Sequence, residues 1–495
     1  MFKTKYWLLG IFLLTLFVRL ILAFYLPNFS YESYFYLRQV EHISTSGLPL
    51  YQDSLSYGGR ELVFLPLFYY LMAFFDLLFP LEIVAKIIPN LLLSTLTLII
   101  FYISKKINAN EIGALLAASV AGFLPILYST NSFNPDTLFL PLVFLAIYFF
   151  MNFDNKNKIY MYLYLLILLL LCLTSSATFL LLVGFGFYLA LSKLEGKKIN
   201  NYELELMLFS LFFYLWTQFL FFKAVLLEEG INFIWQNVPS AIILNYFPKI
   251  SLIQAIILVS VIPFLTGIFA VYRSLFELKK QKAFLLISLV ISTTLMAWFR
   301  LIPFKLSLSF FGLILAVFFA SFYEEVQAYL NKMKLLSLDK YLLSIVIIVL
   351  ILSTLIPAIL TALKQDLPSN EEVEAFRWLR DNSPKNSGVI ALLEEGNLIT
   401  YYSQRKNIID DQFMRVKDVD KRFADLNSLY NTKFQTHALS LLDEYKYSYL
   451  VLTPKAKQKY DLVNFDYLSP ECFERVYKNE TRIYKAVCSL EAVKS

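Results

Sequence analysis

Ionisable and polar side chains stand beside apolar segments at four places in this sequence. They are Glu32 and Arg38 after the first apolar run, Asn134 and Asp136 before a later one, and Glu228, Glu229 and Arg300 after two others. Carboxylates there can accept a proton or bind a metal ion, and arginines can hold a phosphate. Because charge near hydrocarbon is costly, such residues usually mark a function.

These residue types suit the transfer of a group away from a lipid phosphate. Glu32 and Asp136 are the candidates for a catalytic carboxylate that deprotonates or orients the acceptor. Arg300 and Arg38 are the candidates for binding the donor phosphate as it leaves. The four residues can act together only if they share one face of the membrane.

A divalent ion such as Mg²⁺ or Mn²⁺ could also stabilise the leaving phosphate. The sequence does not identify which metal this would be. Asn134, Glu228 and Glu229 are further candidates for contacting the acceptor or a metal. Each place also has an ordinary structural interpretation. Asp136 could cap a helix, Arg300 could snorkel to the interface, and the two glutamates could lie in a solvated loop.

Several other function classes find no support. The sequence has no Gly-rich phosphate loop, no Cys/His metal cluster and no Ser-His-Asp arrangement, and its two histidines are His42 and His437. The formal net charge is +6, but the basic residues are spread over short loops between apolar runs, so no nucleic-acid partner is expected.

The elements that must position these residues are membrane helices. Hydrophobic residues make up 58% of the 495-residue chain and charged residues 17%. Runs of about 20 apolar residues match the hydrocarbon core, and only helices satisfy their backbone there at such lengths. The pattern predicts about eleven transmembrane helices. The predicted spans are 7–26, 83–103, 112–130, 137–153, 159–174, 178–192, 204–222, 252–272, 283–299, 306–322 and 341–363.

The positive-inside rule gives the orientation. Lysine-rich loops such as Lys105-Lys106 and Lys197-Lys198 alternate with loops that hold few cations, which predicts a cytoplasmic N-terminus in a multi-pass cell-membrane protein. Residues 1–363 then form the transmembrane domain, with a long outer loop over 27–81. Within it, Leu62 to Phe79 is apolar enough to span, but a span there would invert every later loop, so an interfacial or re-entrant helix is preferred. A true extra span stays the alternative.

Residues 364–495 are expected to form an extracytoplasmic α/β domain. Ser369 and Glu372 form a capping box before a helical pattern, and 388–393 and 447–452 have the composition of strands. Cys472 and Cys488 flank a predicted hairpin that places them opposite each other. A disulfide is therefore expected in an oxidising compartment, and two reduced strand residues are the alternative.

The chain resembles the GT-C superfamily of membrane glycosyltransferases. Glu32-Ser33-Tyr34-Phe35-Tyr36-Leu37-Arg38 is similar to the first-loop motif of the oligosaccharyltransferase catalytic subunit, with Glu32 in place of an Asp. Asn134-Pro135-Asp136 resembles that family's second acidic motif. The long first outer loop is also similar to those of protein O-mannosyltransferases and lipid A aminoarabinose transferases. This resemblance implies a sugar donor linked to a polyprenyl phosphate such as dolichyl phosphate, and catalysis at the outer face.

One motif departs from that family. Leu392-Leu393-Glu394-Glu395-Gly396 stands where the oligosaccharyltransferases have Trp-Trp-Asp-Tyr-Gly, which puts recognition of an Asn-x-Ser/Thr acceptor in doubt. The favoured function is a hexosyltransferase that passes one sugar to a lipid-linked glycan, a protein or another surface acceptor. The alternatives are an oligosaccharyltransferase-like enzyme with a degenerate acceptor motif and a non-catalytic membrane assembly or transport protein.

Overall fold

The computed structural model describes residues 2–108, 110–153, 158–230, 234, 238, 251–278, 280–332 and 338–490. The chain divides into two compact units. The helical unit comprises Met1–Leu26, Leu65–Lys223 and Tyr246–Gln365, and the sheet unit comprises Pro27–Phe64, Ala224–Asn245 and Asp366–Ser495.

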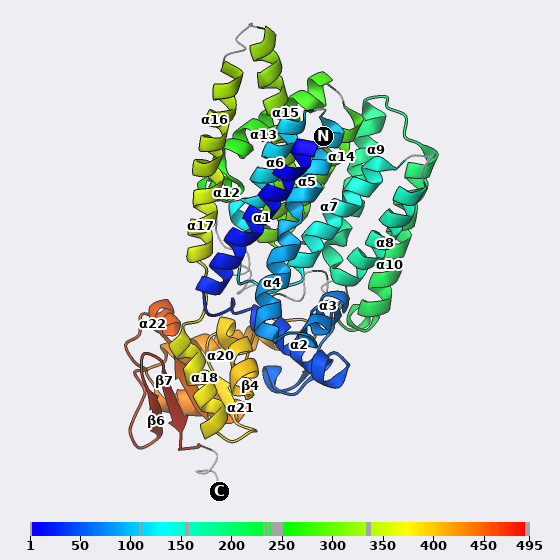
Figure 1. The fold of residues 1–495 in the computed structure, drawn as a ribbon. Helices are drawn as coiled ribbons and strands as arrows, with labels where there is room; N and C mark the ends of the chain where they lie inside the picture. The colour runs from blue at the N-terminus through cyan, green and yellow to red at the C-terminus, as the bar shows by residue number, and fades with distance from the viewer. Residues whose placement is uncertain are drawn as a thin grey trace. The chain divides into compact units, whose positions relative to one another are not determined.

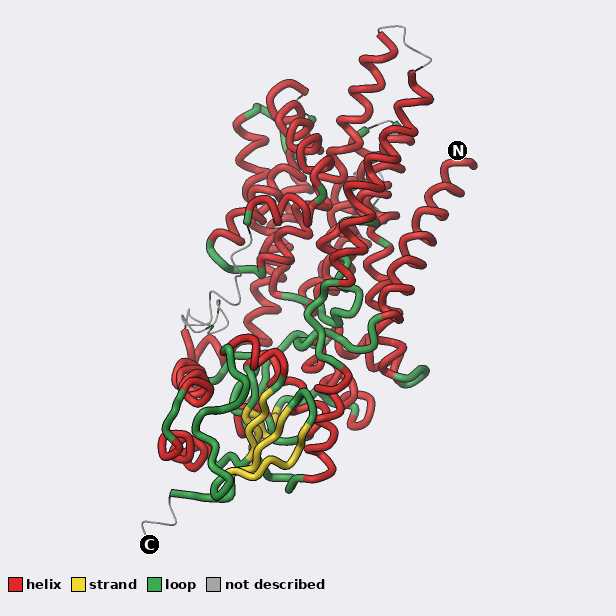
Figure 2. The backbone as a smooth tube through the Cα atoms, turned by 90° about the vertical axis from the view of Figure 1, so that its left-hand side faces the viewer, coloured by secondary structure: helices red, strands yellow, loops and turns green. Residues whose placement is uncertain are grey.

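Apolar helices make up the described part of the helical unit (Figures 1 and 2). Their bounds are α1 (Phe2–Tyr25), α3 (Leu67–Asp76), α4 (Leu81–Ser94), α5 (Leu96–Ile107), α6 (Glu111–Gly122), α7 (Asp136–Asn152), α8 (Ile159–Thr174), α9 (Phe179–Leu194), α10 (Asn201–Glu229, whose last residues belong to the sheet unit), α12 (Leu252–Val259), α13 (Val261–Arg273), α14 (Gln281–Trp298), α15 (Phe304–Lys332), α16 (Leu338–Leu350) and α17 (Ile356–Leu363).

Eight helices among the described residues are long and apolar enough to cross a membrane, and four more are apolar but shorter. All eight long helices, and three of the four shorter ones, each match one of the eleven predicted spans. The remaining short helix is α3, which lies within the ambiguous Leu62 to Phe79 segment. Its 10 residues extend about 15 Å, roughly half the thickness of the hydrocarbon core, which favours the interfacial interpretation.

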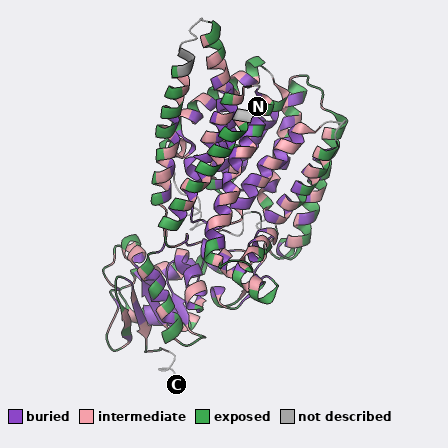
Figure 3. Ribbon diagram, in the orientation of Figure 1, coloured by how far each residue is buried: buried purple, intermediate pink, exposed green. Residues whose placement is uncertain are grey.

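Helix α15 forms the centre of the helical unit. Within its most apolar stretch 83% of residues are buried, against 17% for Tyr341–Leu363, which comprises most of α16 and all of α17. Figure 3 shows the many exposed residues of α16 and α17. Small residues allow close packing on α15: a Cβ on Gly113 of α6 would lie 3.0 Å from the backbone oxygen of Ala320. The predicted multi-span helical fold is confirmed.

Two predicted spans are broken, and the prediction of continuous helices there was wrong. The 252–272 span divides at Ser260, whose φ of +76° ends α12 before α13 begins. The 112–130 span ends as an α-helix at Gly122 and continues as the short helix η2 (Pro125–Leu127). Pro263 and Pro125 lack the N–H that a continuous helix needs, and hydropathy does not register that loss.

The sheet unit surrounds one five-stranded sheet. Its elements are α2 (Ser33–Ser46), β1 (Gln52–Asp53), β2 (Arg60–Glu61), α18 (Asn370–Asn382), β3 (Gly388–Ile390), η7 (Leu393–Glu395), α19 (Gly396–Leu398), η8 (Ile399–Ser403), β4 (Lys406–Asn407), α20 (Val419–Asn431), α21 (Gln435–Tyr445), β5 (Tyr449–Leu452), α22 (Pro454–Tyr460), β6 (Phe473–Lys478) and β7 (Arg482–Ala486).

The strand order is β4-β3-β5-β7-β6. Strand β3 pairs parallel with β4 and β5, whereas β7 pairs antiparallel with β5 and β6. Every residue of β3 and β5 is buried, as expected for central strands covered on both faces.

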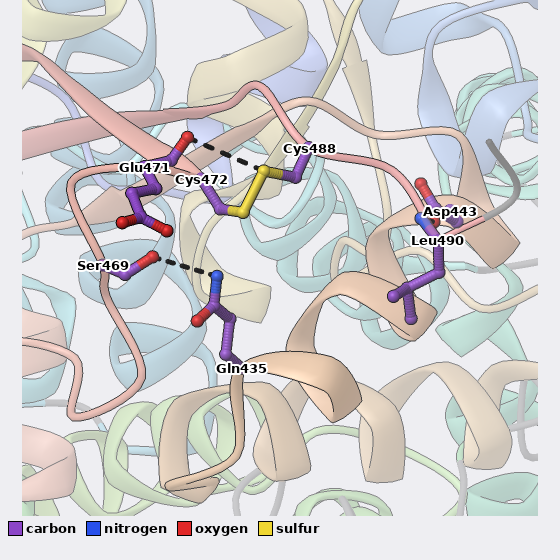
Figure 4. The surroundings of a disulfide bond; sticks show 7 residues. All are labelled: Gln435, Asp443, Ser469, Glu471, Cys472, Cys488 and Leu490. Atoms are coloured by element: carbon purple, nitrogen blue, oxygen red, sulfur yellow. Dashed lines mark hydrogen bonds between the residues drawn. A yellow bond between two sulfur atoms is a disulfide. The ribbon is translucent and has the colours of Figure 1, made fainter. Parts of the chain in front are cut away.

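Local patterns in the C-terminal region were predicted correctly. The Ser369 hydroxyl accepts from the N–H of Glu372, and the Glu372 carboxylate accepts from the N–H of Ser369, which completes the capping box. Strands β6 and β7 form the predicted hairpin. A disulfide joins Cys472 to Cys488, whose Cα atoms lie 4.8 Å apart, so that prediction is confirmed (Figure 4).

The compact units divide the chain differently from the predicted domains. Pro27–Phe64, assigned from the sequence to the transmembrane domain, belongs with the C-terminal residues. Side chains that are buried at the contact, including Tyr34 and Tyr57, form this association. It joins residues more than 300 positions apart, which local composition does not reveal.

Candidate functional site

Glu32 lies directly before α2 in the sheet unit. It is half-buried, and its carbonyl oxygen accepts from the N–H of Phe35 at 3.2 Å. Fully buried Tyr34 anchors this end of α2, because its ring lies 5.4 Å from that of Tyr401 and 5.2 Å from that of Tyr402. The aromatic residues of the first-loop motif therefore hold the acid against the C-terminal part of the chain.

Asp411 is an electrostatic neighbour of Glu32 that sequence reasoning missed. Burial, the adjacent Asp410 and Glu32 raise the pKa of Asp411 to about 7, against the opposing effect of hydrogen bonds. Those bonds come from Asn397 Nδ2 at 2.8 Å and Gln412 Nε2 at 3.1 Å. Asp411 is thus near enough to the predicted base for the charge of Glu32 to affect its pKa.

A buried network fixes the Pro27–Phe64 segment on the sheet. The Ser56 hydroxyl donates to Asp410 at 2.5 Å, and the N–H of Tyr57 donates to Asn407 Oδ1 at 2.8 Å. Arg60 pairs with Asp410 at 3.2 Å. These contacts set the place of the loop relative to Asp411.

Arg38 has a structural partner. Its two terminal nitrogens donate to the Asp53 carboxylate at 2.7 and 2.8 Å. Burial alone would raise the pKa of Asp53, but Arg38 and the N–H groups of Leu55 and Ser56 lower it below the ordinary value. Binding a donor phosphate would require this pair to open, and that role for Arg38 stays a prediction.

Asn134, Asp136 and Arg300 belong to the helical unit. Asp136 is the first residue of α7, where the helix dipole favours a carboxylate. The carbonyl oxygen of Asn134 accepts from the hydroxyl of Thr137 at 2.8 Å, and its side-chain amide donates to Ser132 at 3.1 Å. Arg300 is exposed just after α14, with a φ of +56°. The roles predicted for the three stay predictions.

Glu228 and Glu229 end α10 and contact an arginine of the sheet unit. Glu228 accepts from Arg415 Nε at 3.1 Å and Nη2 at 2.8 Å, and Glu229 accepts from the Arg415 backbone N–H at 2.7 Å. Glu61 accepts from the remaining terminal nitrogen. The predicted acceptor or metal role would therefore have to compete with Arg415. Trp235, Gln236 and Asn237, which follow these glutamates in the sequence, lie outside the described residues.

The acid of the altered motif lies in the core. Glu395 is fully buried and accepts from the Thr453 hydroxyl at 2.5 Å and from the Leu392 N–H at 3.0 Å. Burial and Glu372 raise its pKa to about 8. The next residue must be glycine, because a Cβ on Gly396 would lie 2.2 Å from the backbone oxygen of Ile409.

No three His, Cys, Asp or Glu side chains among the described residues lie close enough to hold one metal ion together. Mg²⁺ is often held by only one or two carboxylates together with water, so the metal role predicted for Asn134, Glu228 and Glu229 stays a prediction.

Sequence reasoning also missed Arg19. Its side chain is fully buried in α1, where all other residues from Leu16 to Phe24 are apolar. A single charge inside a predicted span was the signal that could have found it.

A family model described as dolichyl-phosphate-mannose-protein mannosyltransferase matches residues 65–221. No curated protein was found to match the sequence. Solved structures do match its fold. The archaeal oligosaccharyltransferase AglB from Archaeoglobus fulgidus, in complex with an inhibitory peptide and a dolichol-phosphate, has a TM-score of 0.68 and 15% identity, over 90% of this chain and 69% of that chain.

Two further structures support the same fold. The Archaeoglobus fulgidus oligosaccharyltransferase in complex with Zn and sulfate gives a TM-score of 0.63 at 14% identity, over 89% of this chain and 67% of that one. ArnT from Cupriavidus metallidurans, bound to undecaprenyl phosphate, gives 0.58 at 11% identity, over 98% of each chain. The resemblance predicted from the first-loop motif is thus confirmed, and this multi-pass membrane protein has the fold of the GT-C glycosyltransferases.

Proposed function

We propose that this protein is a membrane hexosyltransferase that takes its sugar from a polyprenyl phosphate and passes it to an acceptor on the outer face. Glu32 carries this proposal, because it is a half-buried carboxylate held by aromatic packing beside the titrating Asp411. The matched family model and the fold shared with AglB and ArnT support the same donor class.

In the proposed reaction, Glu32 accepts the proton of an acceptor hydroxyl. The oxygen attacks the anomeric carbon of the sugar, and the bond from that carbon to the phosphate oxygen breaks. The electron pair leaves with the polyprenyl phosphate, whose charge Arg300 stabilises. Asp411 near Glu32 provides a group that can take the proton onward to water.

The catalytic face is proposed to be extracytoplasmic. The distribution of lysines supports this orientation. The Cys472 to Cys488 disulfide agrees with an oxidising compartment for the sheet unit.

The test uses purified protein in lipid nanodiscs with labelled hexosyl polyprenyl phosphates. Acceptors are a lipid-linked glycan, an Asn-x-Thr peptide and a Ser-rich peptide. We expect label on one of them from the lipid donor and none from a nucleotide sugar alone. A parallel reaction supplies a lipid-linked oligosaccharide as donor. Transfer of that whole oligosaccharide to the Asn-x-Thr peptide would instead establish the oligosaccharyltransferase-like alternative.

A variant tests the phosphate role. Arg300→Ala should raise KM for the donor about tenfold and leave KM for the acceptor unchanged, since a charge-assisted bond to phosphate is lost. Lys305→Ala is the matched control, because Lys305 is an exposed cation in the first turn of α15. Equal effects of both changes would remove Arg300 from the proposal.

A further inference from the structure

The chain between α6 and α7 has no α-helix, although it lies within the membrane-embedded unit. Residues 123–135 contain only the short helix η2 and lead directly into Asn134-Pro135-Asp136. Tyr128 and Phe133 in this segment are fully buried. Irregular backbone at such a place persists only where protein groups satisfy its carbonyl oxygens.

Side chains from three parts of the helical unit supply those hydrogen bonds. Arg19 Nη1 of α1 donates to the carbonyl oxygen of Leu127 at 3.0 Å, and Asn90 Nδ2 of α4 donates to that of Thr130 at 2.8 Å. Gln365 Nε2, just after α17, reaches the carbonyl oxygen of Tyr128 at 3.4 Å. We call Arg19, Asn90 and Gln365 the carbonyl clamp.

Arg19 is the member of this clamp whose burial costs free energy, because its side chain is charged. Its guanidinium is fully buried and lies 4.5 Å from the centre of the Tyr128 ring. Within the described chain its Nε and Nη2 have no hydrogen-bond partner. An apolar residue at this position would avoid the cost of a buried charge, so packing alone does not account for an arginine.

We propose that Arg19 is a positioning residue that fixes residues 127–131 and thereby sets the place of Asp136. The bond to Leu127 and the contact with Tyr128 hold the start of the segment. Asn90 and Gln365 hold the next carbonyl oxygens, which leaves little freedom before α7 begins. For activity, the inference rests on the proposed sugar transfer and on Asp136 being the second candidate for a catalytic carboxylate. The order of residues 127–131 depends on neither.

The first test needs no activity. Hydrogen exchange is followed by mass spectrometry on peptides covering 124–137 in nanodiscs. Arg19→Met, which keeps the length and removes the donors, should speed exchange there about tenfold. Thr15→Val is the matched control one turn away on α1, because the Thr15 hydroxyl has no hydrogen-bond partner within the described chain. Unchanged exchange in Arg19→Met would overturn the proposal.

The second test is a double-mutant cycle on sugar transfer. Arg19→Met should lower kcat about 10- to 100-fold and change KM for the donor less than about threefold, since it misplaces a group and removes no binding contact. Combined with Asp136→Asn it should add almost nothing to the loss from Asp136→Asn alone. Fully additive losses would show that Arg19 does not act through Asp136.

Two outcomes separate this proposal from the proposed function. If the wild-type protein transfers no sugar from any lipid phosphate, the proposed function is wrong. The hydrogen-exchange result would still show whether Arg19 orders residues 127–131. If Arg19→Met does not accumulate in membranes, Gln365→Met tests the same clamp and should raise exchange of the same peptides by a smaller factor. No change in that variant would overturn the proposal.

Discussion

Glu32 and Glu395 occupy two segments that resemble motifs of the same enzyme family, yet their surroundings differ. Glu32 is half-buried at the start of α2, with a titrating carboxyl group as neighbour. Glu395 is fully buried, and Thr453 and Leu392 provide its hydrogen bonds. The first environment leaves an acid partly exposed, whereas the second makes an acid part of the core.

The largest expected effect is a loss of sugar-transfer rate when Glu32 is changed. Glu32→Gln should lower kcat by about 10² to 10⁴, because the amide keeps the size but cannot accept a proton. Glu41→Gln, an exposed glutamate on the same helix, is the control and should transfer sugar at the wild-type rate. The transfer rates of the wild-type protein and of both variants are measured with saturating donor. Near wild-type transfer by Glu32→Gln would move the base to Asp136, Glu228 or Glu229.

The second effect concerns the glycine beside Glu395. Gly396→Ala should destabilise the sheet unit by about 1 to 3 kcal/mol, because its Cβ would overlap backbone. Thermal unfolding followed by tryptophan fluorescence measures the loss. Gly186→Ala in α9 is the control, since a Cβ there meets nothing within 4 Å. Equal melting temperatures for the two variants would contradict the tight packing at Gly396.

The third effect is the pH dependence of stability. The pKa of Glu395 is raised to about 8 in the folded protein, above the unfolded value of about 4.3. The folded state therefore holds the proton between these values, and the contribution to stability is present below about pH 4 and is lost as pH rises to about 8.

Melting temperatures across that range test this sign. Wild-type Tm should fall several degrees more than that of Glu395→Gln as pH rises from about 5 to 8. Equal falls in the two proteins would show that the Glu395 carboxyl is already charged in the folded protein.

The smallest effect concerns Asp411. Its pKa of about 7 predicts an inflection near neutral pH in the profile of kcat/KM, because a charge appears beside Glu32. Asp411→Asn should remove that inflection while changing the rate at the optimum only a few-fold. An identical inflection in the variant would assign it to another group.

Short-range patterns in this sequence were sufficient for much of the fold. Apolar runs located the spans, and Ser369 with Glu372 located the start of α18. Hairpin spacing brought Cys472 opposite Cys488. These features depend on residues that are close together in the sequence, so propensity and periodicity are enough to predict them.

The rest depends on contacts between distant segments. Nothing near Asp411 in the sequence indicates that Glu32 is its electrostatic neighbour, and nothing near Glu228 points to Arg415. The break at Ser260 also escaped hydropathy, since serine is tolerated within apolar helices. The candidate residues could be named from the sequence, but their partners could not.

The association of the Pro27–Phe64 segment with the C-terminal residues has a consequence for biosynthesis. The Ser56 hydroxyl and its partner Asp410 are 354 positions apart, and Tyr57 and Asn407 are 350 apart. At ribosomal rates of about 5–20 residues per second, the loop waits roughly 20 to 70 s for its partners to be made. During that interval Tyr34 and Tyr57 lack the surface that later buries them. The nascent chain is then most dependent on a chaperone, over an interval that outlasts the synthesis of the last apolar helix, α17.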